Sequence, residues 1–228
     1  MKKTIWFIIH CLLITLLPTN THAQQAKIGN WIAYIGNQKI NGKWNFHNEI
    51  QYRNYNFIGE INQLLIRTGV GYALSKQDNL LLGYAYVESH PYNPLPEKNI
   101  SIKEHRLFQQ YIHRNRINKM YLVNRIRFEE RFFKNDFKTR GRHFISLSNP
   151  IQKNEITRNT YYWSLYNEIF INNRSNYFDR DRLFVGGGYA INNNLRVETG
   201  FMIQFFSKYN QKQLMMTFLN SLPLHKTI

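Results

Sequence analysis

Apolar and polar residues alternate along most of this chain with a period of two. Between Trp44 and Arg53, one face carries Trp44, Phe46, Asn48, Ile50 and Tyr52, and the other carries Asn45, His47, Glu49, Gln51 and Arg53. Successive side chains of a β-strand point to opposite faces of its sheet, so this period predicts a strand. Most of these segments have about ten residues, the length that a tilted strand needs to cross a membrane. The pattern therefore predicts an all-β protein.

Eleven segments carry this alternation, and turn-rich stretches separate them. The segments are residues 31–36, 44–53, 63–72, 80–89, 103–115, 120–131, 142–149, 161–171, 182–191, 195–205 and 213–219. Alternation does not assign the faces of 80–89 and 103–115. Longer polar connections are expected at residues 90–100, 134–140, 152–158 and 172–181. Because bacterial barrels close with an even number of strands, we expect an antiparallel transmembrane β-barrel of ten to twelve strands, with twelve favoured.

The amino-terminal 23 residues have a different character. Lys2 and Lys3 precede an apolar run over residues 5–17, and Thr21-His22-Ala23 has the small-x-small pattern of a cleavage site. The run is too short for a membrane-spanning helix, which needs about 20 residues. We therefore expect a cleavable secretory signal at residues 1–23 and one barrel domain at residues 24–228, exported to the outer membrane.

The cysteine content narrows the chemistry further. Cys11 is the one cysteine of the chain, and it lies inside the predicted signal. After cleavage, disulfides, thiol nucleophiles and thiolate metal sites are therefore excluded. We expect no cofactor and no metal site, because the eight histidines are scattered and no helix follows Gly186-Gly187-Gly188 to bind a phosphate.

The composition argues against disorder and for a basic protein. Hydrophobic residues make up 43% of the chain and aromatic residues 15%, enough to organise one folded domain. There are 30 Lys and Arg against 14 Asp and Glu, and the mean hydropathy is −0.49. Such a balance also suits a nucleic-acid-binding protein, but an exported barrel has no ordinary access to nucleic acid. We expect the basic turns to meet outer-membrane lipids and lipopolysaccharide instead.

A soluble, exported, lipocalin-like barrel would alternate too, with its apolar face inside. Two features favour the membrane. The polar faces mix Gly, Ser, Gln, Arg and Glu, as in the lumen of a membrane barrel, and the apolar faces carry aromatic residues near strand ends. We expect an outer aromatic girdle that contains Trp31, Trp44, Tyr52, Tyr55, Tyr72, Tyr161 and Trp163.

The predicted inward faces carry eleven charged residues. They are Arg53, Arg67, Arg125, Arg127, Arg131, Arg182 and Arg196 with Glu49, Glu129, Glu168 and Glu198. A carboxylate in a low-dielectric lumen is costly unless it is paired, and the planar fork of arginine suits it. One interpretation is a ladder of ion pairs that fills and stiffens a narrow barrel. The other is a lumen whose surplus arginines favour small anions.

Several short motifs carry a family resemblance. They are Asn48-Glu49-Ile50-Gln51-Tyr52-Arg53, Asn62-Gln63-Leu64-Leu65-Ile66-Arg67, Gly69-Val70-Gly71-Tyr72, Leu82-Gly83-Tyr84-Ala85-Tyr86, Glu104-His105-Arg106, Tyr166-Asn167-Glu168-Ile169-Phe170 and Asp181-Arg182-Leu183-Phe184-Val185-Gly186-Gly187-Gly188-Tyr189. With them the chain resembles an uncharacterised family of Gram-negative outer-membrane barrels, domain-of-unknown-function family 2490, over almost all of the predicted mature chain. The resemblance implies an outer-membrane barrel and brings no activity and no catalytic residues.

Three roles remain open for a monomeric outer-membrane barrel without enzymatic activity. It is a structural wall, a narrow anion-favouring pore, or a protein that binds an envelope ligand. The alternative is a lipid-modifying hydrolase, because His143, Ser146 and Ser148 share a strand. The period of two places His143 opposite both serines, so this strand alone cannot form a Ser-His pair. No Gly-x-Ser-x-Gly motif occurs.

Overall fold

The computed structural model describes residues 28–91, 100–173 and 177–224. The predicted signal at residues 1–23 lies outside them. The described residues form eleven strands: β1 (Gly29–Asn41), β2 (Trp44–Asn54), β3 (Ile61–Ala73), β4 (Asp78–Ser89), β5 (Ile102–Ile117), β6 (Met120–Phe133), β7 (Asp136–Pro150), β8 (Thr160–Asn172), β9 (Phe178–Ala190), β10 (Leu195–Phe205) and β11 (Asn210–Asn220). No helix in these ranges is long and apolar enough to cross a membrane.

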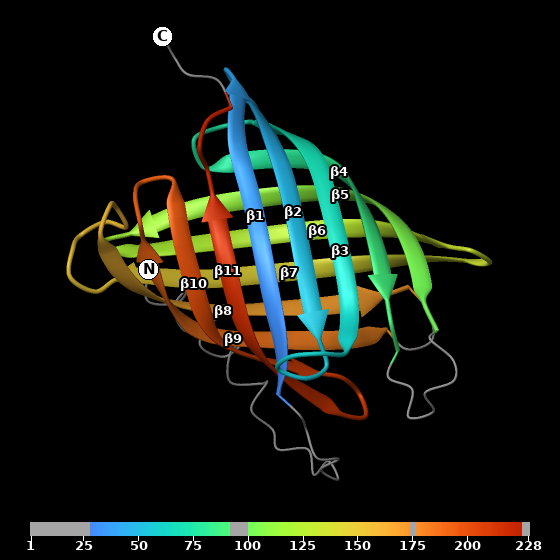
Figure 1. Cartoon of the computed structure of the whole chain (residues 1–228). Helices are drawn as coiled ribbons and strands as arrows, with labels where there is room; N and C mark the ends of the chain where they lie inside the picture. Colours follow the sequence, from blue (N-terminus) through green and yellow to red (C-terminus); the bar gives the residue numbers. More distant parts are fainter. Residues whose placement is uncertain (1–27, 92–99, 174–176, 225–228) are drawn as a thin grey trace.

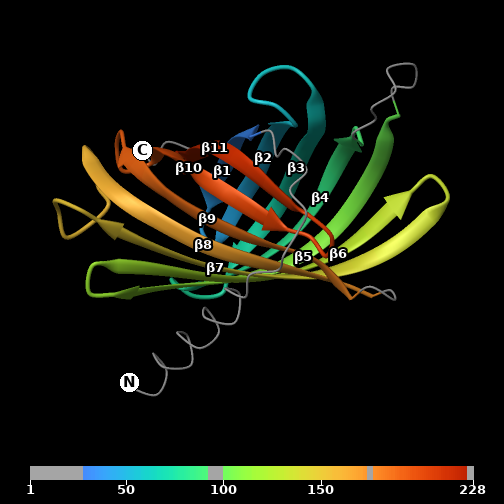
Figure 2. The same cartoon turned by 90° about the horizontal axis from the view of Figure 1, so that it is seen from below.

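The strands form one closed barrel (Figures 1 and 2). Neighbours in the sequence pair antiparallel from β1 to β11, and the barrel closes where β1 pairs parallel with β11. Figure 1 shows these two strands side by side. In this register Ala33 is the partner of Thr217. The all-β barrel is confirmed for the described residues.

The expected even number of strands, with twelve favoured, is not what the described residues form. Fully antiparallel closure requires an even number, because the first and last strands must then run in opposite directions. With eleven strands β1 and β11 run in the same direction, and parallel pairing closes the barrel instead.

Two connections are shorter than the sequence predicts. Residues 134–140 were expected to be a long polar connection, but β6 and β7 are joined by Lys134 and Asn135 alone. Residues 136–140 belong to β7, and residues 178–181 of the next predicted connection belong to β9. The polar residues that suggested loops include Arg140 and Arg180, which point into the barrel and form ion pairs there.

The two faces of the wall differ sharply in polarity. Ile126 and Val185 on the outer face are 58% and 59% exposed. Arg127 and Glu129, on the inner face of β6, are buried. This arrangement is the reverse of a soluble barrel, which buries its apolar face.

Trp31 is the exception to the predicted outer girdle. It lies inside the barrel, 2% exposed, and lines the central cavity. The expectation that it faces outward is wrong, because β1 points Trp31 and Ala33 inward and leaves Ile32 on the exposed outer face.

Glycines on the inner face give room to aromatic rings. Gly186 and Gly200 are partners on β9 and β10, and the ring of Phe184 lies against both. A side chain at either position would collide with the other strand and with this ring. Phe184 therefore packs across bare backbone, which allows an aromatic core in a narrow barrel.

Candidate functional site

A cavity of about 730 Å³ occupies the barrel interior, and residues from all eleven strands line it. Its lining contains twelve arginines: Arg53, Arg67, Arg106, Arg114, Arg125, Arg127, Arg131, Arg140, Arg142, Arg180, Arg182 and Arg196. It contains four glutamates: Glu49, Glu104, Glu168 and Glu198. Positive charge is therefore in excess, even with the adjacent buried Glu129 included.

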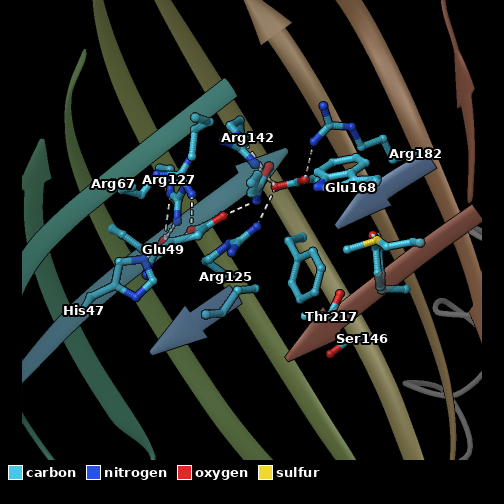
Figure 3. Close-up of a pocket in the computed structure, with 18 of the residues that line it drawn as sticks. His47, Glu49, Arg67, Arg125, Arg127, Arg142, Ser146, Glu168, Arg182 and Thr217 are labelled. Atoms are coloured by element: carbon cyan, nitrogen blue, oxygen red, sulfur yellow. Dashed lines mark hydrogen bonds and ion pairs between the residues drawn. The ribbon is translucent and has the colours of Figure 1, made fainter. Parts of the chain in front are cut away.

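The charged residues predicted to face inward all lie in or beside this cavity. Glu49, Arg53, Arg67, Arg125, Arg127, Arg131, Glu168, Arg182, Arg196 and Glu198 line it. Glu129 is buried in the wall next to them and is 0% exposed. Figure 3 shows several of these side chains converging from different strands.

Glu168 on β8 binds three arginines from three strands. Its carboxylate lies 2.6 Å from Arg125 on β6, 2.7 Å from Arg142 on β7 and 3.3 Å from Arg182 on β9 (Figure 3). One carboxylate thus bridges neighbouring and more distant strands. The guanidinium groups reach it because Arg125 and Arg182 lie at the level of Glu168 in the strand register and Arg142 lies two residues away.

Glu129 on β6 has a similar role. Arg140 and Arg142 of β7 each approach it to 2.5 Å, and Arg127 and Arg106 lie 3.8 and 3.9 Å away. Because Arg142 contacts both Glu129 and Glu168, the two clusters form one network. A connected network compensates the desolvation of its members better than isolated pairs do.

Two smaller clusters complete the inner charge pattern. Glu49 accepts hydrogen bonds from Arg67 and Gln51, and His47 lies 3.3 Å from it (Figure 3). On β5, Glu104 pairs with Arg106, and Arg131 of β6 also reaches it. Aromatic rings inside the barrel form cation–π contacts with the same arginines. The guanidinium carbons of Arg142 and Arg182 lie 4.5 and 4.4 Å from the ring centroid of Phe170.

Besides Asp179, which pairs with Arg140 and Arg180, five cavity-lining residues of the ion-pair network were missed on the sequence. They are Glu104, Arg106, Arg140, Arg142 and Arg180. Glu104 and Arg106 belong to a segment whose faces could not be assigned, and Arg140 and Arg180 were placed in connections. Arg142 was within reach of the sequence, because it shares the face of Ser146 in a predicted strand.

His143 and the two serines of β7 lie on opposite faces of the barrel wall. Ser146 and Ser148 line the cavity, whereas His143 lies on the exposed outer face, where its Nε2 is 3.0 Å from the Asn124 side-chain oxygen. The described residues also contain no cluster of three or more His, Cys, Asp or Glu side chains that could hold a metal ion. The surplus of guanidinium groups over carboxylates gives this interior a positive charge, which attracts anions.

The family comparison agrees with this architecture. The model of the family described as "Protein of unknown function (DUF2490)" matches residues 28–215. The chain belongs to the DUF2490 family. The matched range runs from the start of the barrel into β11, so the DUF2490 unit is the barrel itself. The resemblance noted from short motifs is thereby confirmed. No curated protein and no solved structure matches the chain.

Proposed function

We propose that this protein is an integral outer-membrane β-barrel whose basic interior favours small anions. The observation that carries the proposal is the polarity of the wall. Charged side chains are buried inside, and large apolar side chains are exposed outside on the same strands. An apolar outer surface of this extent is unfavourable in water and favourable in lipid.

Aromatic pairs at both ends of the outer surface support the membrane assignment. Trp44 packs on Tyr72 with ring centroids 5.0 Å apart, and Tyr161 packs on Tyr189 at 4.8 Å, both at one end of the barrel. Rings of this kind prefer the interface between lipid and water. At the opposite end Phe132 packs on Phe137 of β7, with ring centroids 5.1 Å apart.

The arginine surplus supports the preference for anions. Glu49, Glu104, Glu129 and Glu168 each contact at least one arginine, so these four carboxylates are already paired with a positive charge. The cavity still has more guanidinium groups than carboxylates. A permeating anion would be attracted by this surplus, and a cation would be repelled. The same pairs brace the wall, so the ladder interpretation describes how the interior is held together.

The other roles have less support. A lipid-modifying hydrolase would need a nucleophile next to its base, and His143 has no serine on its face of β7. A soluble lipocalin-like barrel would bury the apolar face that this wall exposes. Binding of an envelope ligand is compatible with the cavity and is developed below.

Ion selectivity in a planar bilayer tests the proposal. We expect the purified barrel to carry a current whose reversal potential in a KCl gradient shows chloride permeating more readily than potassium. Replacing the exposed loop residue Arg158 by Gln should leave the reversal potential unchanged, because Arg158 is not one of the residues that line the cavity. A cation-selective current, or no current at all, contradicts the anion path.

A further inference from the structure

Arg53 differs from the other buried arginines of the described chain. The buried arginines are Arg53, Arg67, Arg106, Arg127, Arg140, Arg142 and Arg182. Each of the others has a carboxylate oxygen within 4 Å, and Arg53 has none. Arg53 donates one hydrogen bond to Gln51, and its buried Nε–H has no acceptor. A buried charge without a counter-charge is strongly unfavourable, so a bound anion would stabilise Arg53.

Trp31 fixes the position of this free charge. The guanidinium carbon of Arg53 lies 3.6 Å from the centroid of the Trp31 ring, and that of Arg182 lies 5.0 Å from it. Stacking on an aromatic face holds a guanidinium group without using its N–H donors. The buried indole Nε1–H of Trp31 has no acceptor either. Two cations and two unused donors are thus held around one ring.

Three arginines are among the charges that act most strongly on Arg53. The charges that repel it are Arg182, Arg180 and Arg106, and the carboxylate that attracts it is Glu49. Glu49 is already bound to Arg67. All four arginines around this point line the cavity, whose volume of about 730 Å³ lies in the range of small-ligand sites. The cavity lining around Arg53 is therefore rich in guanidinium groups.

The chemistry of these donors selects the kind of anion. A guanidinium fork binds two oxygens of one phosphate or carboxylate group side by side, which a spherical chloride ion cannot offer. Several cations around one point favour an ion with more than one negative charge. We infer that Arg53, Arg182 and Trp31 form a binding site for a phosphate group, either free or carried by a small solute. This inference deepens the proposed function and rests on it, because the ligand must enter the barrel interior.

Trp31 itself provides the measurement. The chain has four tryptophans, of which Trp6 lies in the predicted signal and Trp44 and Trp163 face outward. In barrel purified from cells expressing the full chain with Trp44→Phe and Trp163→Phe, the fluorescence therefore reports on Trp31. We expect a saturable change on titration with inorganic phosphate or glycerol 3-phosphate, and none with acetate at equal ionic strength. Tighter binding of glycerol 3-phosphate would identify a phosphorylated solute as the ligand, and tighter binding of inorganic phosphate the free ion.

Matched variants separate the site from general charge. Arg53→Gln should weaken phosphate binding by about tenfold or more, the loss of about 1.4 kcal/mol of binding free energy. Arg53→Lys keeps the charge but not the two parallel donors of the guanidinium group. Its phosphate affinity should lie between those of the wild type and Arg53→Gln. Arg196→Gln removes a cavity arginine near Glu198 and should leave the affinity within about twofold, since a distant charge adds little through water. Folding of each variant is checked by heat-modifiable gel mobility.

The outcomes are distinct from those of the pore experiment. A response that does not saturate, or that is the same in Arg53→Gln, overturns the site. An anion-selective current without saturable phosphate binding also overturns the site and leaves the proposed pore standing. Saturable binding without any current keeps the site and contradicts the pore.

Discussion

At the scale of single residues, a few buried carboxylates hold the interior together. Glu129 has no exposed surface and contacts Arg140 and Arg142 at 2.5 Å. Arg106 and Arg127 stand slightly further away. Without Glu129, four guanidinium groups would face one another around a neutral residue. The stability of the barrel should therefore depend strongly on this one negative charge.

We predict that Glu129→Gln lowers the free energy of unfolding by about 3–5 kcal/mol, the usual effect of removing one partner of a buried ion pair. Urea unfolding in lipid vesicles measures this value. Glu155→Gln is the control, because Glu155 pairs with Arg116 on an exposed surface and such pairs contribute about 0–1 kcal/mol. Equal effects of the two substitutions would mean that the inner network contributes little.

Residue type and alternation together predict much of this interior, with one instructive error. All eleven charged residues assigned inward lie in or beside the cavity, because charge on one face of a half-apolar strand has a single plausible direction. Trp31 was assigned outward on the ground that membrane barrels carry aromatic girdles. Aromatic rings are also favourable in an arginine-rich interior, where Trp31 forms cation–π contacts with Arg53 and Arg182.

At the scale of strands, the alternation located the segments, but neither the number of strands nor their closure was predicted, because an even number with twelve favoured was expected. The eleven alternating segments correspond to the eleven strands, but alternation reports only which face is buried, not which strand a terminal strand meets. The faces of β4 and β5 were unassignable for a related reason. These strands point Leu81, Val87, Phe108 and Ile112 inward and carry apolar residues outward too, so the polar contrast disappears.

Parallel closure predicts a specific cross-link. Ala33 on β1 and Thr217 on β11 are partners, and both side chains are buried. The variant Ala33→Cys with Thr217→Cys should form a disulfide on mild oxidation, because adjacent strands lie about 4.8 Å apart. The shift is visible by non-reducing gel electrophoresis.

The control pairs Ala33→Cys with Gln213→Cys. Gln213 is the partner of Gly29, four residues along β1 from Ala33, so the two sulfurs should be too far apart to join. Cross-linking in the control and not in the predicted pair would mean that the barrel closes with another register.

At the scale of the whole molecule, the proposed membrane assignment requires the apolar outer face of the barrel to meet lipid. The strand faces make the answer testable residue by residue. Which residues share a strand face can be predicted from the sequence, because polar and apolar residues alternate. The partners within the ion network were not predictable, because alternation gives the face of each residue but not which arginine on the neighbouring strands contacts Glu129 or Glu168. The cavity around Arg53 was likewise not predictable, because its lining combines residues of the adjacent strands β1 and β2 with residues of β9, which is not next to them in the sheet.

Cysteine accessibility in lipid vesicles shows which face of the barrel meets lipid, and it needs no prior removal of cysteines because Cys11 lies in the predicted signal. Ile126→Cys and Val185→Cys place a thiol on the exposed outer face, and Ser146→Cys places one in the cavity. For the barrel in lipid vesicles, we predict that a small anionic maleimide labels Ser146→Cys and leaves both outer thiols unlabelled. Rapid labelling of Ile126→Cys and Val185→Cys in vesicles would contradict the account.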